Sequence, residues 1–92
     1  MIYIEHKYLK IVKDILKQYP YKFYAYGSRV KGTHRLTSDL DICFLDIIPF
    51  NVQAHIEEQF VESDLPFQVD FSDFNLMSKE FQELIKKDLV LI

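Results

Sequence analysis

Residues 27–41 have the sequence GSRVKGTHRLTSDLD and separate two short apolar segments. The segment before them, residues 22–26 (KFYAY), is aromatic and predicts a β-strand. The segment after them, residues 42–45 (ICFL), is apolar and continues a second predicted strand that opens at the two aspartates. Gly27 and Gly32 are the only glycines of the chain, and both lie in the polar stretch. We therefore expect a turn, a short helix and a loop between the two strands.

An amphipathic helix is expected before the first strand. Apolar side chains recur there at the spacing of one helical face, namely at Tyr8, Ile11, Val12, Ile15, Leu16 and Tyr19. Pro20 should end this helix, because proline cannot continue the hydrogen-bond pattern. Residues 49–63 predict another helix, in which apolar residues are spaced by four at Val52, Ile56 and Phe60.

The C-terminal third predicts one more strand and one more helix. Between residues 67 and 72, apolar and polar residues alternate, as in a strand with one polar face. Ser78 can cap a final helix, and residues 89–92 (LVLI) should form an edge strand or pack against the body. The expected order α-β-α-β-α-β-α describes a single α/β (α+β) domain over residues 1–92, with a small mixed sheet of three to four strands flanked by helices.

Asp39 and Asp41 carry the clearest chemical signal. Side chains two apart in a strand project to the same face, so the two carboxylates should lie close together. Their repulsion favours a hard cation between them, and Mg²⁺ takes one or two protein carboxylates while keeping water and phosphate oxygens as further ligands. Asp-x-Asp also occurs at solvated strand edges without any function. Here, however, the pair opens an apolar run, where aspartate is otherwise disfavoured.

A phosphate-binding turn is expected just upstream of this pair. Gly27 directly follows a strand, and a helix that starts near Ser28 would present free N–H groups and the positive end of its dipole. The Ser28 hydroxyl can add a hydrogen bond and Arg29 or Lys31 a charge, so we assign nucleotide binding to Gly27, Ser28 and Arg29. The alternative is an ordinary strand-to-helix turn. The stretch is not a Walker A loop, because Thr33 stands where that motif needs lysine.

Asp70 is the candidate for a third carboxylate. It lies on the expected polar face of the third strand, together with Gln68 and Ser72. It could complete a two-metal site or act as the base toward an incoming hydroxyl, and the alternative is a solvated strand position. Asp46 and Asp73 are its rivals: the first lies beyond the second strand, and the second has the parity of the apolar face.

Together these features resemble the minimal nucleotidyltransferases of the DNA polymerase beta-like superfamily. Their pattern is Gly-Ser, ten residues, Asp-x-Asp and a third aspartate on a later strand, matched here by Gly27-Ser28, Asp39-Leu40-Asp41 and Asp70. The resemblance covers almost the whole chain and implies the polymerase beta-like fold. It implies that Gly27 and Ser28 hold a triphosphate, and that Asp39, Asp41 and Asp70 ligate Mg²⁺, as two ions, and form the catalytic triad.

The activity implied by the resemblance is the transfer of a nucleoside monophosphate, AMP from ATP, to an acceptor hydroxyl. Larger members of the superfamily add a helical domain that binds the base or the acceptor, and 92 residues leave no room for one. We therefore expect a partner protein as the acceptor, as in the antitoxins that adenylylate a tyrosine of a HEPN toxin. Two alternatives remain: a non-catalytic module that neutralises its partner by contact, and a stand-alone aminoglycoside-type nucleotidyltransferase, which the short length disfavours.

The composition narrows the remaining classes. A net charge of −3 gives no long-range attraction to nucleic acid, so no direct nucleic-acid binding is expected. Cys43 is the only cysteine, which excludes an intrachain disulfide and a cysteine-cluster zinc site and fits a reducing cytoplasm. We expect neither a signal peptide nor a membrane span. The three histidines have no metal-ligand spacing: His6, His34 and His55.

The aromatic content predicts an association surface. Aromatic residues make up 15% of a chain whose core can only be small. We expect a homodimer, or a heteromer with a mainly helical partner such as a HEPN-type toxin. The expected contact surfaces are the tyrosine-bearing first helix and the apolar residues 89–92.

Overall fold

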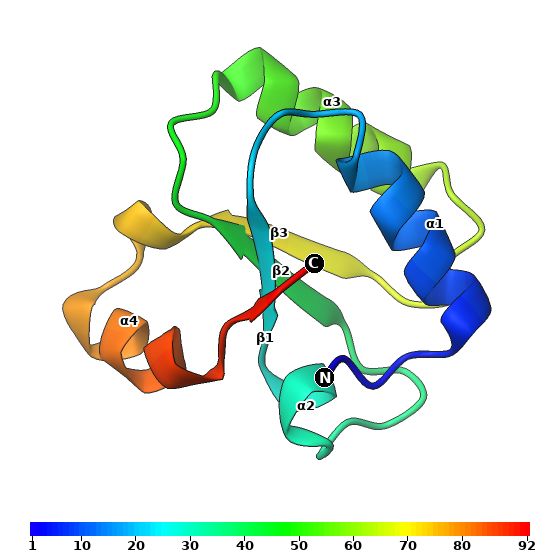
Figure 1. Cartoon of the computed structure of the whole chain (residues 1–92), viewed down its shortest axis with the longest axis horizontal. Helices are drawn as coiled ribbons and strands as arrows, with labels where there is room; N and C mark the ends of the chain where they lie inside the picture. The colour runs from blue at the N-terminus through cyan, green and yellow to red at the C-terminus, as the bar shows by residue number, and fades with distance from the viewer.

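The computed structural model describes residues 1–92 and is built on a mixed four-stranded sheet (Figure 1). The strands are β1 (Phe23–Tyr26), β2 (Leu40–Phe44), β3 (Val69–Asp73) and β4 (Val90–Leu91). Their order across the sheet is β3-β2-β1-β4, with β2 and β3 parallel and β1 antiparallel to both of its neighbours. The mixed α/β class expected from the sequence is confirmed.

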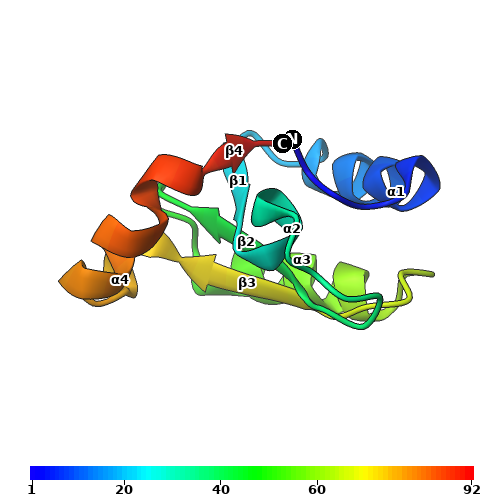
Figure 2. The same cartoon turned by 90° about the horizontal axis from the view of Figure 1, so that it is seen from below.

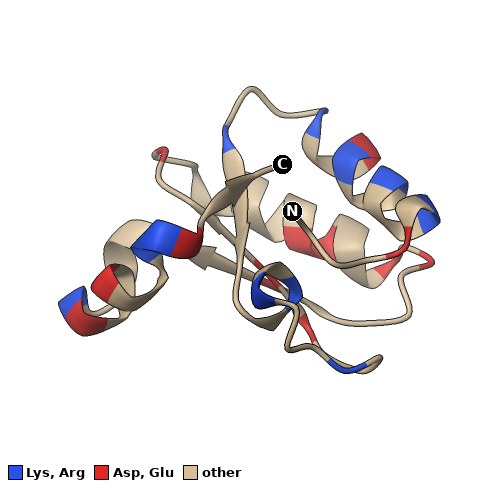
Figure 3. Cartoon of the chain, turned by 60° about the horizontal axis from the view of Figure 1, so that its bottom comes forward, with Lys and Arg blue, Asp and Glu red and all other residues tan.

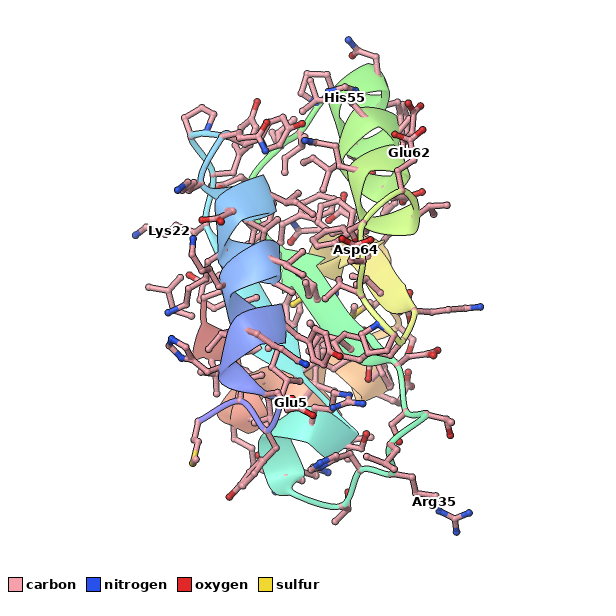
Figure 4. All side chains as sticks on the ribbon, turned by 90° about the vertical axis from the view of Figure 1, so that its right-hand side faces the viewer. Glu5, Lys22, Arg35, His55, Glu62 and Asp64 are labelled. Carbon is pink, nitrogen blue, oxygen red and sulfur yellow. The ribbon has the colours of Figure 1, made fainter.

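Helices lie on both faces of this sheet. They are α1 (His6–Leu16), α2 (Ser28–Lys31), α3 (Phe50–Val61) and α4 (Lys79–Ile85), with short 3-10 helices η1 (Phe74–Leu76) and η2 (Lys86–Asp88) on either side of α4. Helices α1 and α3 pack side by side over one face, with their side chains interleaved (Figures 1 and 4). Helix α4 lies on the other face, away from that pair (Figure 2).

The larger core lies between the sheet and the α1–α3 pair. Alternate residues of β1 and β2 point into it, because side chains two apart in a strand share a face. The buried members are Val12, Ile15, Leu16, Phe23, Ala25, Leu40, Ile42, Phe44, Ile48, Ile56 and Phe60. Phe71 of β3 adds a ring to this face, with its centroid 5.0 Å from that of Phe44. The odd-numbered residues of β3 therefore face the larger core, and its even-numbered residues face the other side.

The opposite face carries a smaller core under α4. Its buried members are Tyr26, Cys43, Phe74 and Ile85. Ser78 caps α4 as expected, since its hydroxyl accepts a hydrogen bond from the backbone N–H of Phe81. Because this cluster is small, it covers only part of the face. The even-numbered side chains of β3 lie on the same face and are not part of the apolar cluster.

The structure refines the expected elements in three places: two boundaries and the C-terminal segment. Helix α1 ends at Leu16, before Tyr19, and β2 begins one residue after Asp39. Of the two alternatives for residues 89–92, the edge strand is correct, because β4 pairs antiparallel with β1. No helix of the protein has the length and apolar character needed to cross a membrane.

The tyrosines of the α1 region contact neighbours within the chain. Tyr8 packs edge-to-face on Phe67, and the Tyr19 hydroxyl, just beyond the helix, donates a hydrogen bond to Gln59 of α3. The surface expected here as a docking face is therefore partly used by the protein's own packing. Beyond the N-terminal Met1, the most exposed large apolar side chains lie elsewhere, in loops and at helix ends: Leu36, Ile47, Phe50, Val61 and Leu76.

Candidate active site

A row of polar side chains crosses three strands on the α4 side of the sheet. Tyr26 of β1 is the register partner of Asp41 in β2, and Asp41 is the register partner of Asp70 in β3. Register partners point to the same face, so all three side chains project from one side. Tyr26 is buried, Asp41 is half-buried and Asp70 is exposed. The row therefore runs from the interior of the small core out to solvent.

Gly27 brings the predicted phosphate turn directly against this row. Its backbone has φ 83° and ψ −156°, a conformation almost confined to glycine. A β-carbon built on Gly27 would lie 2.3 Å from Asp41 Oδ2, which is closer than real β-carbons approach. Glycine is thus needed both for the dihedral angles and for the space. The end of β1 and the Asp41 carboxylate are immediate neighbours, although 14 positions separate residues 27 and 41 in the sequence.

Helix α2 is a single turn that starts at Ser28. The N–H groups of Val30 and Lys31 donate to the Gly27 carbonyl, so the N–H groups of Ser28 and Arg29 have no partner inside the turn. Ser28 is partly exposed at this first position. The turn can therefore offer two backbone donors and one hydroxyl to an anion on the side where Asp41 lies.

The carboxylates of this region have no cationic partner. None of the ion pairs of the protein includes Asp39, Asp41 or Asp70. Partial burial, then the negative charges of Asp70 and Asp39, raise the pKa of Asp41 to about 6. Figure 3 shows acidic positions where the chain enters β2 and basic positions on the neighbouring α2. Unbalanced negative charge on oxygen ligands is the condition that a hard divalent cation relieves.

The donor set fits Mg²⁺ in kind. No three acidic, histidine or cysteine side chains stand close enough together to form a ready-made metal group. Asp41 and Asp70 are paired across neighbouring strands, while Asp39 lies exposed just before β2. Mg²⁺ takes one or two protein carboxylates and completes its shell with water and phosphate oxygens. The residues present match that requirement, with a nucleotide supplying the remaining oxygens.

The Arg29 side chain stabilises the loop between α2 and β2. Its guanidinium is buried and donates to the backbone carbonyls of Tyr3, Arg35, Leu36 and Ser38. It also stacks over the ring of Phe67, 4.3 Å from the ring centroid. These bonds fix the loop that leads into Asp39, whereas the Arg35 side chain on that loop points out into solvent (Figure 4). The Arg29 guanidinium is therefore occupied within the protein, and only the backbone N–H of Arg29 remains as its expected contact with a nucleotide.

The rival aspartates have local partners of their own. Asp46 Oδ2 accepts a hydrogen bond from the Lys22 backbone N–H at 2.9 Å. Asp73 Oδ1 accepts from the Asn75 backbone N–H at 2.9 Å and so caps η1. Both lie at the far end of the sheet from Asp41, and neither joins the polar row. Asp70 remains the third carboxylate on the face that carries Asp41.

Cys43 and the histidines have no part in the polar row. Burial raises the pKa of the Cys43 thiol to about 11, so it stays protonated and unreactive. His34 stacks on Tyr3, and His55 packs edge-to-face on Tyr19.

A hollow of about 570 Å³ near the N-terminal segment is lined mainly by apolar side chains, and none of the three aspartates lines it.

The sequence pattern did not single out Tyr26. It gives the strand and the parity of the residue, but it does not give the register that sets Tyr26 beside Asp41. The alternation of the third strand predicts Ser72 on its polar face and gives it no role. In the structure its hydroxyl donates to Asp70 Oδ1 at 3.2 Å. Strand register is a property of the folded sheet, and only the structure supplies it.

Comparison with known proteins identifies the family of the chain. The model of the nucleotidyltransferase domain family matches residues 6–91. The chain belongs to this family. It is 42% identical over 93 aligned positions to a Haemophilus influenzae protein named probable protein adenylyltransferase MntA, covering 97% of this chain and 82% of that one. As a member of the family the chain is a nucleotidyltransferase, with the family match spanning all three aspartates and the Gly27 turn.

The fold was also compared with solved structures. A crystal structure assigned as a nucleotidyltransferase from Sulfolobus solfataricus superposes with a TM-score of 0.49 and 22% sequence identity. The superposition covers 89% of this chain and 72% of the other.

Proposed function

We propose that this nucleotidyltransferase moves AMP from ATP to a hydroxyl of a partner protein, with Asp39, Asp41 and Asp70 as its acidic residues. One observation carries the proposal: the Gly27 turn lies directly against Asp41, which pairs with Asp70 across the sheet. A phosphate cradle and uncompensated carboxylates in contact are what phosphoryl chemistry needs. The name of the Haemophilus relative, a probable protein adenylyltransferase, supports AMP as the group and a protein as the acceptor.

Each residue has a distinct part in the proposed reaction. The N–H groups of Ser28 and Arg29, with the Ser28 hydroxyl, hold the triphosphate at the end of β1. The acceptor oxygen attacks the α-phosphorus, the bond from that phosphorus to the bridging oxygen breaks, and pyrophosphate leaves with the electron pair. Asp70, exposed at the open end of the row, takes the proton of the acceptor hydroxyl. Bound Mg²⁺, as two ions on the carboxylates, would offset the negative charge of the phosphates.

The partner proposed is a HEPN-type toxin with a tyrosine as the acceptor, this chain acting as its antitoxin. Exposed apolar side chains at Ile47 and Phe50 support a protein partner, because soluble monomers usually hide such groups. A cytoplasmic location fits the free, buried thiol of Cys43. A homodimer is the other assembly that the same surface would serve.

Mass spectrometry of the co-purified partner tests the proposal. After incubation with ATP and Mg²⁺, the partner should gain the mass of one or more adenylyl groups. The Asp39→Asn/Asp41→Asn variant should lose transfer and keep its fold, because relieving the repulsion between carboxylates does not weaken the native state. The Glu62→Gln/Asp64→Asn variant makes the same change of charge at the end of α3 (Figure 4) and should transfer normally.

A second variant tests the phosphate turn. Ser28→Ala should weaken the use of ATP and leave partner binding unchanged, because the proposed reaction gives the hydroxyl a contact with the triphosphate and none with the partner. Equal transfer rates for Ser28→Ala and the native chain would reduce the serine to a turn residue. If the double aspartate variant still neutralises its partner and no adenylyl group is ever found, the chain acts by contact alone.

A further inference from the structure

Strand β3 leaves its outer edge open. It lies at one side of the sheet with β2 as its only neighbour, while β4 forms the opposite side (Figure 2). The Leu40 N–H donates to the Gln68 carbonyl, so the backbone groups of even-numbered residues in β3 face β2 and those of odd-numbered residues face outward. No hydrogen bond from a turn, a loop or a side chain reaches the backbone of Val69 or Phe71. These two residues therefore offer free donors and acceptors along the edge.

The edge is rigid and has none of the usual protection. The Phe71 ring packs 5.0 Å from that of Phe44 and 6.5 Å from that of Phe60, which holds β3 extended from its inner face. Natural edges are commonly protected by a very short strand, by lysine or by proline. Strand β4 has two residues, whereas β3 has five and contains neither lysine nor proline. An added strand would therefore find the β3 edge already in the conformation that pairing requires.

The same edge leads to the proposed site. Asp70 lies near its start, and Asp73 ends it beside the exposed Leu76 of η1. A residue paired opposite Asp70 in an added strand would project its side chain to the face that carries Asp70. The path from Asp73 back to Asp70 is about 10 Å in an extended chain. A partner that contacts the apolar end of the sheet could therefore reach Asp70 with a short extended segment.

The part of the chain that forms this edge is acidic. Residues 36–78, which include β2, α3 and β3, contain no lysine or arginine, and Figure 3 shows the basic positions on other elements. The acidic residues of this part are Asp39, Asp41, Asp46, Glu57, Glu58, Glu62, Asp64, Asp70 and Asp73. A second copy of β3 paired at the edge would bring like charges together. A basic segment has the complementary charge.

Glu57 brings this charge to the open side of α3. Successive residues of a helix are about 100° apart. Ile56 is buried toward the sheet, and Gln59, to one side of it, bonds Tyr19 near α1. Glu57 therefore lies on the opposite side of α3, away from α1 and toward the edge of β3, which α3 covers. Glu62 lies on the α1 side, where it lines a hollow with residues of that helix, and so provides a matched control.

We propose that β3 binds a basic, extended segment of the partner protein as a fifth strand, and that this segment carries the acceptor hydroxyl to Asp70. The inference rests on the proposed function and adds the way in which the acceptor is held. The backbone groups of Val69 and Phe71 bind the segment whatever its sequence, as in other cases of strand addition, and Glu57 and Asp73 select positive charge.

Kinetics with the partner protein as the varied substrate test the edge. Val69→Pro removes an outward N–H and no hydrogen bond of the fold, and should raise KM for the partner roughly 3- to 10-fold while KM for ATP stays unchanged. Leu91→Pro is the matched control at the other edge: the Ile92 N–H donates to Phe23, so the Leu91 N–H faces outward, and KM should not change. Melting temperatures confirm that both variants fold.

A charge change gives a second test that does not alter the backbone. Glu57→Lys should raise KM for the partner at low salt, and the effect should disappear at high salt because screening removes the attraction. Glu62→Lys makes the same change on the α1 side and should leave KM as it is. An unchanged KM for the partner in both Val69→Pro and Glu57→Lys would overturn the proposal.

A measurement on the free protein separates this inference from the proposed function. Two synthetic peptides of equal length, each with one tyrosine and alternating threonines, carry lysine or glutamate at the remaining positions. Without ATP or Mg²⁺, the lysine peptide should slow hydrogen exchange at the amides of Val69 and Phe71, and the glutamate peptide should not. Protection that needs no peptide and grows with protein concentration would assign the edge to a second copy and overturn the proposal. If the lysine peptide protects these amides and the native chain transfers nothing, the edge site stands and the proposed function fails.

Discussion

Gly27 combines an unusual backbone conformation with a close neighbour. Its dihedral angles lie in a region that side chains exclude, and its missing β-carbon leaves room for Asp41 Oδ2. Gly32, at the other end of α2, also has a positive φ of 77°, but a β-carbon there would meet only the ring of Tyr3 at 3.4 Å. Both positions have a strained backbone, but only Gly27 lies against Asp41. Comparing substitutions at the two glycines therefore separates the cost of backbone strain from the effect of displacing Asp41.

Gly27→Ala should damage both the fold and the site. We expect a loss of about 1–3 kcal/mol in the free energy of unfolding from the strained backbone, with a further displacement of Asp41 that removes transfer. Gly32→Ala should cost about 1–2 kcal/mol and keep transfer. Urea denaturation and the transfer assay measure the two effects. Full activity in Gly27→Ala would show that the contact with Asp41 has no role in the reaction.

The raised pKa of Asp41 makes the metal-free protein sensitive to pH. Its pKa of about 6 lies above the ordinary value of 3.8, so the native state holds the proton more tightly than the unfolded chain. Stability from this group is therefore complete below about pH 4 and is lost as the pH rises through about 6. Because Asp41 is only half-buried, solvent screening reduces the effect to about 1 kcal/mol.

Asp41→Asn should remove this dependence. In EDTA at pH 7 the variant should be more stable than the native chain by about 1 kcal/mol, and at pH 4 the two should be equal. Adding Mg²⁺ should raise the melting temperature of the native chain and leave that of the variant unchanged. Thermal denaturation over this pH range measures both. A native chain that is the more stable one in EDTA at pH 7 would contradict the account of Asp41.

The loop between α2 and β2 depends on Arg29. Arg29→Lys keeps the charge but cannot reproduce the planar set of donors that binds Tyr3, Leu36 and Ser38. We expect a loss of about 2–3 kcal/mol in stability and faster hydrogen exchange over residues 33–38. Hydrogen-exchange mass spectrometry measures the second effect. If the variant kept its native stability and lost only affinity for ATP, the guanidinium would be a phosphate ligand instead.

The sequence predicts the individual helices and strands, but it does not predict how they bring the site residues together. The apolar face of α1 and the cap of α4 follow from local patterns, and both are found. The proximity of Gly27 to Asp41 and the pairing of Asp41 with Asp70 depend on strand order and register, which local patterns do not contain. Local patterns also do not show burial, so they place the polar Arg29, next to a phosphate turn, at the nucleotide, whereas its side chain is buried.

The molecule as a whole exposes apolar groups in the connection from β2 to α3. Ile47 is 95% exposed and Phe50 is 81% exposed. The Asn75 amide donates to the Leu45 carbonyl, which brings the exposed Leu76 of η1 to the same end of the sheet. This end lies opposite the one that carries Asp41, so a partner bound there would leave the site open.

Charged substitutions should break the association of the protein. In light scattering across a concentration series, the native chain should form a homodimer, or a heteromer when the partner is present. Ile47→Asp/Phe50→Asp should shift it to a monomer and keep its fold, because both side chains are outside the core. Val61→Asp, at an exposed position on α3, is the matched control. A native chain that stays monomeric and binds no partner would contradict the assembly proposal.

Transfer of label from ATP tests the central claim most directly. ATP labelled at the α-phosphate and ATP labelled at the γ-phosphate are each incubated with Mg²⁺ and the complex of the chain with its partner. The account predicts that the α-label becomes attached to the partner while the γ-label is released in pyrophosphate, and that Asp39→Asn/Asp41→Asn abolishes both. Attachment of the γ-label, or no attachment of either label, would contradict it.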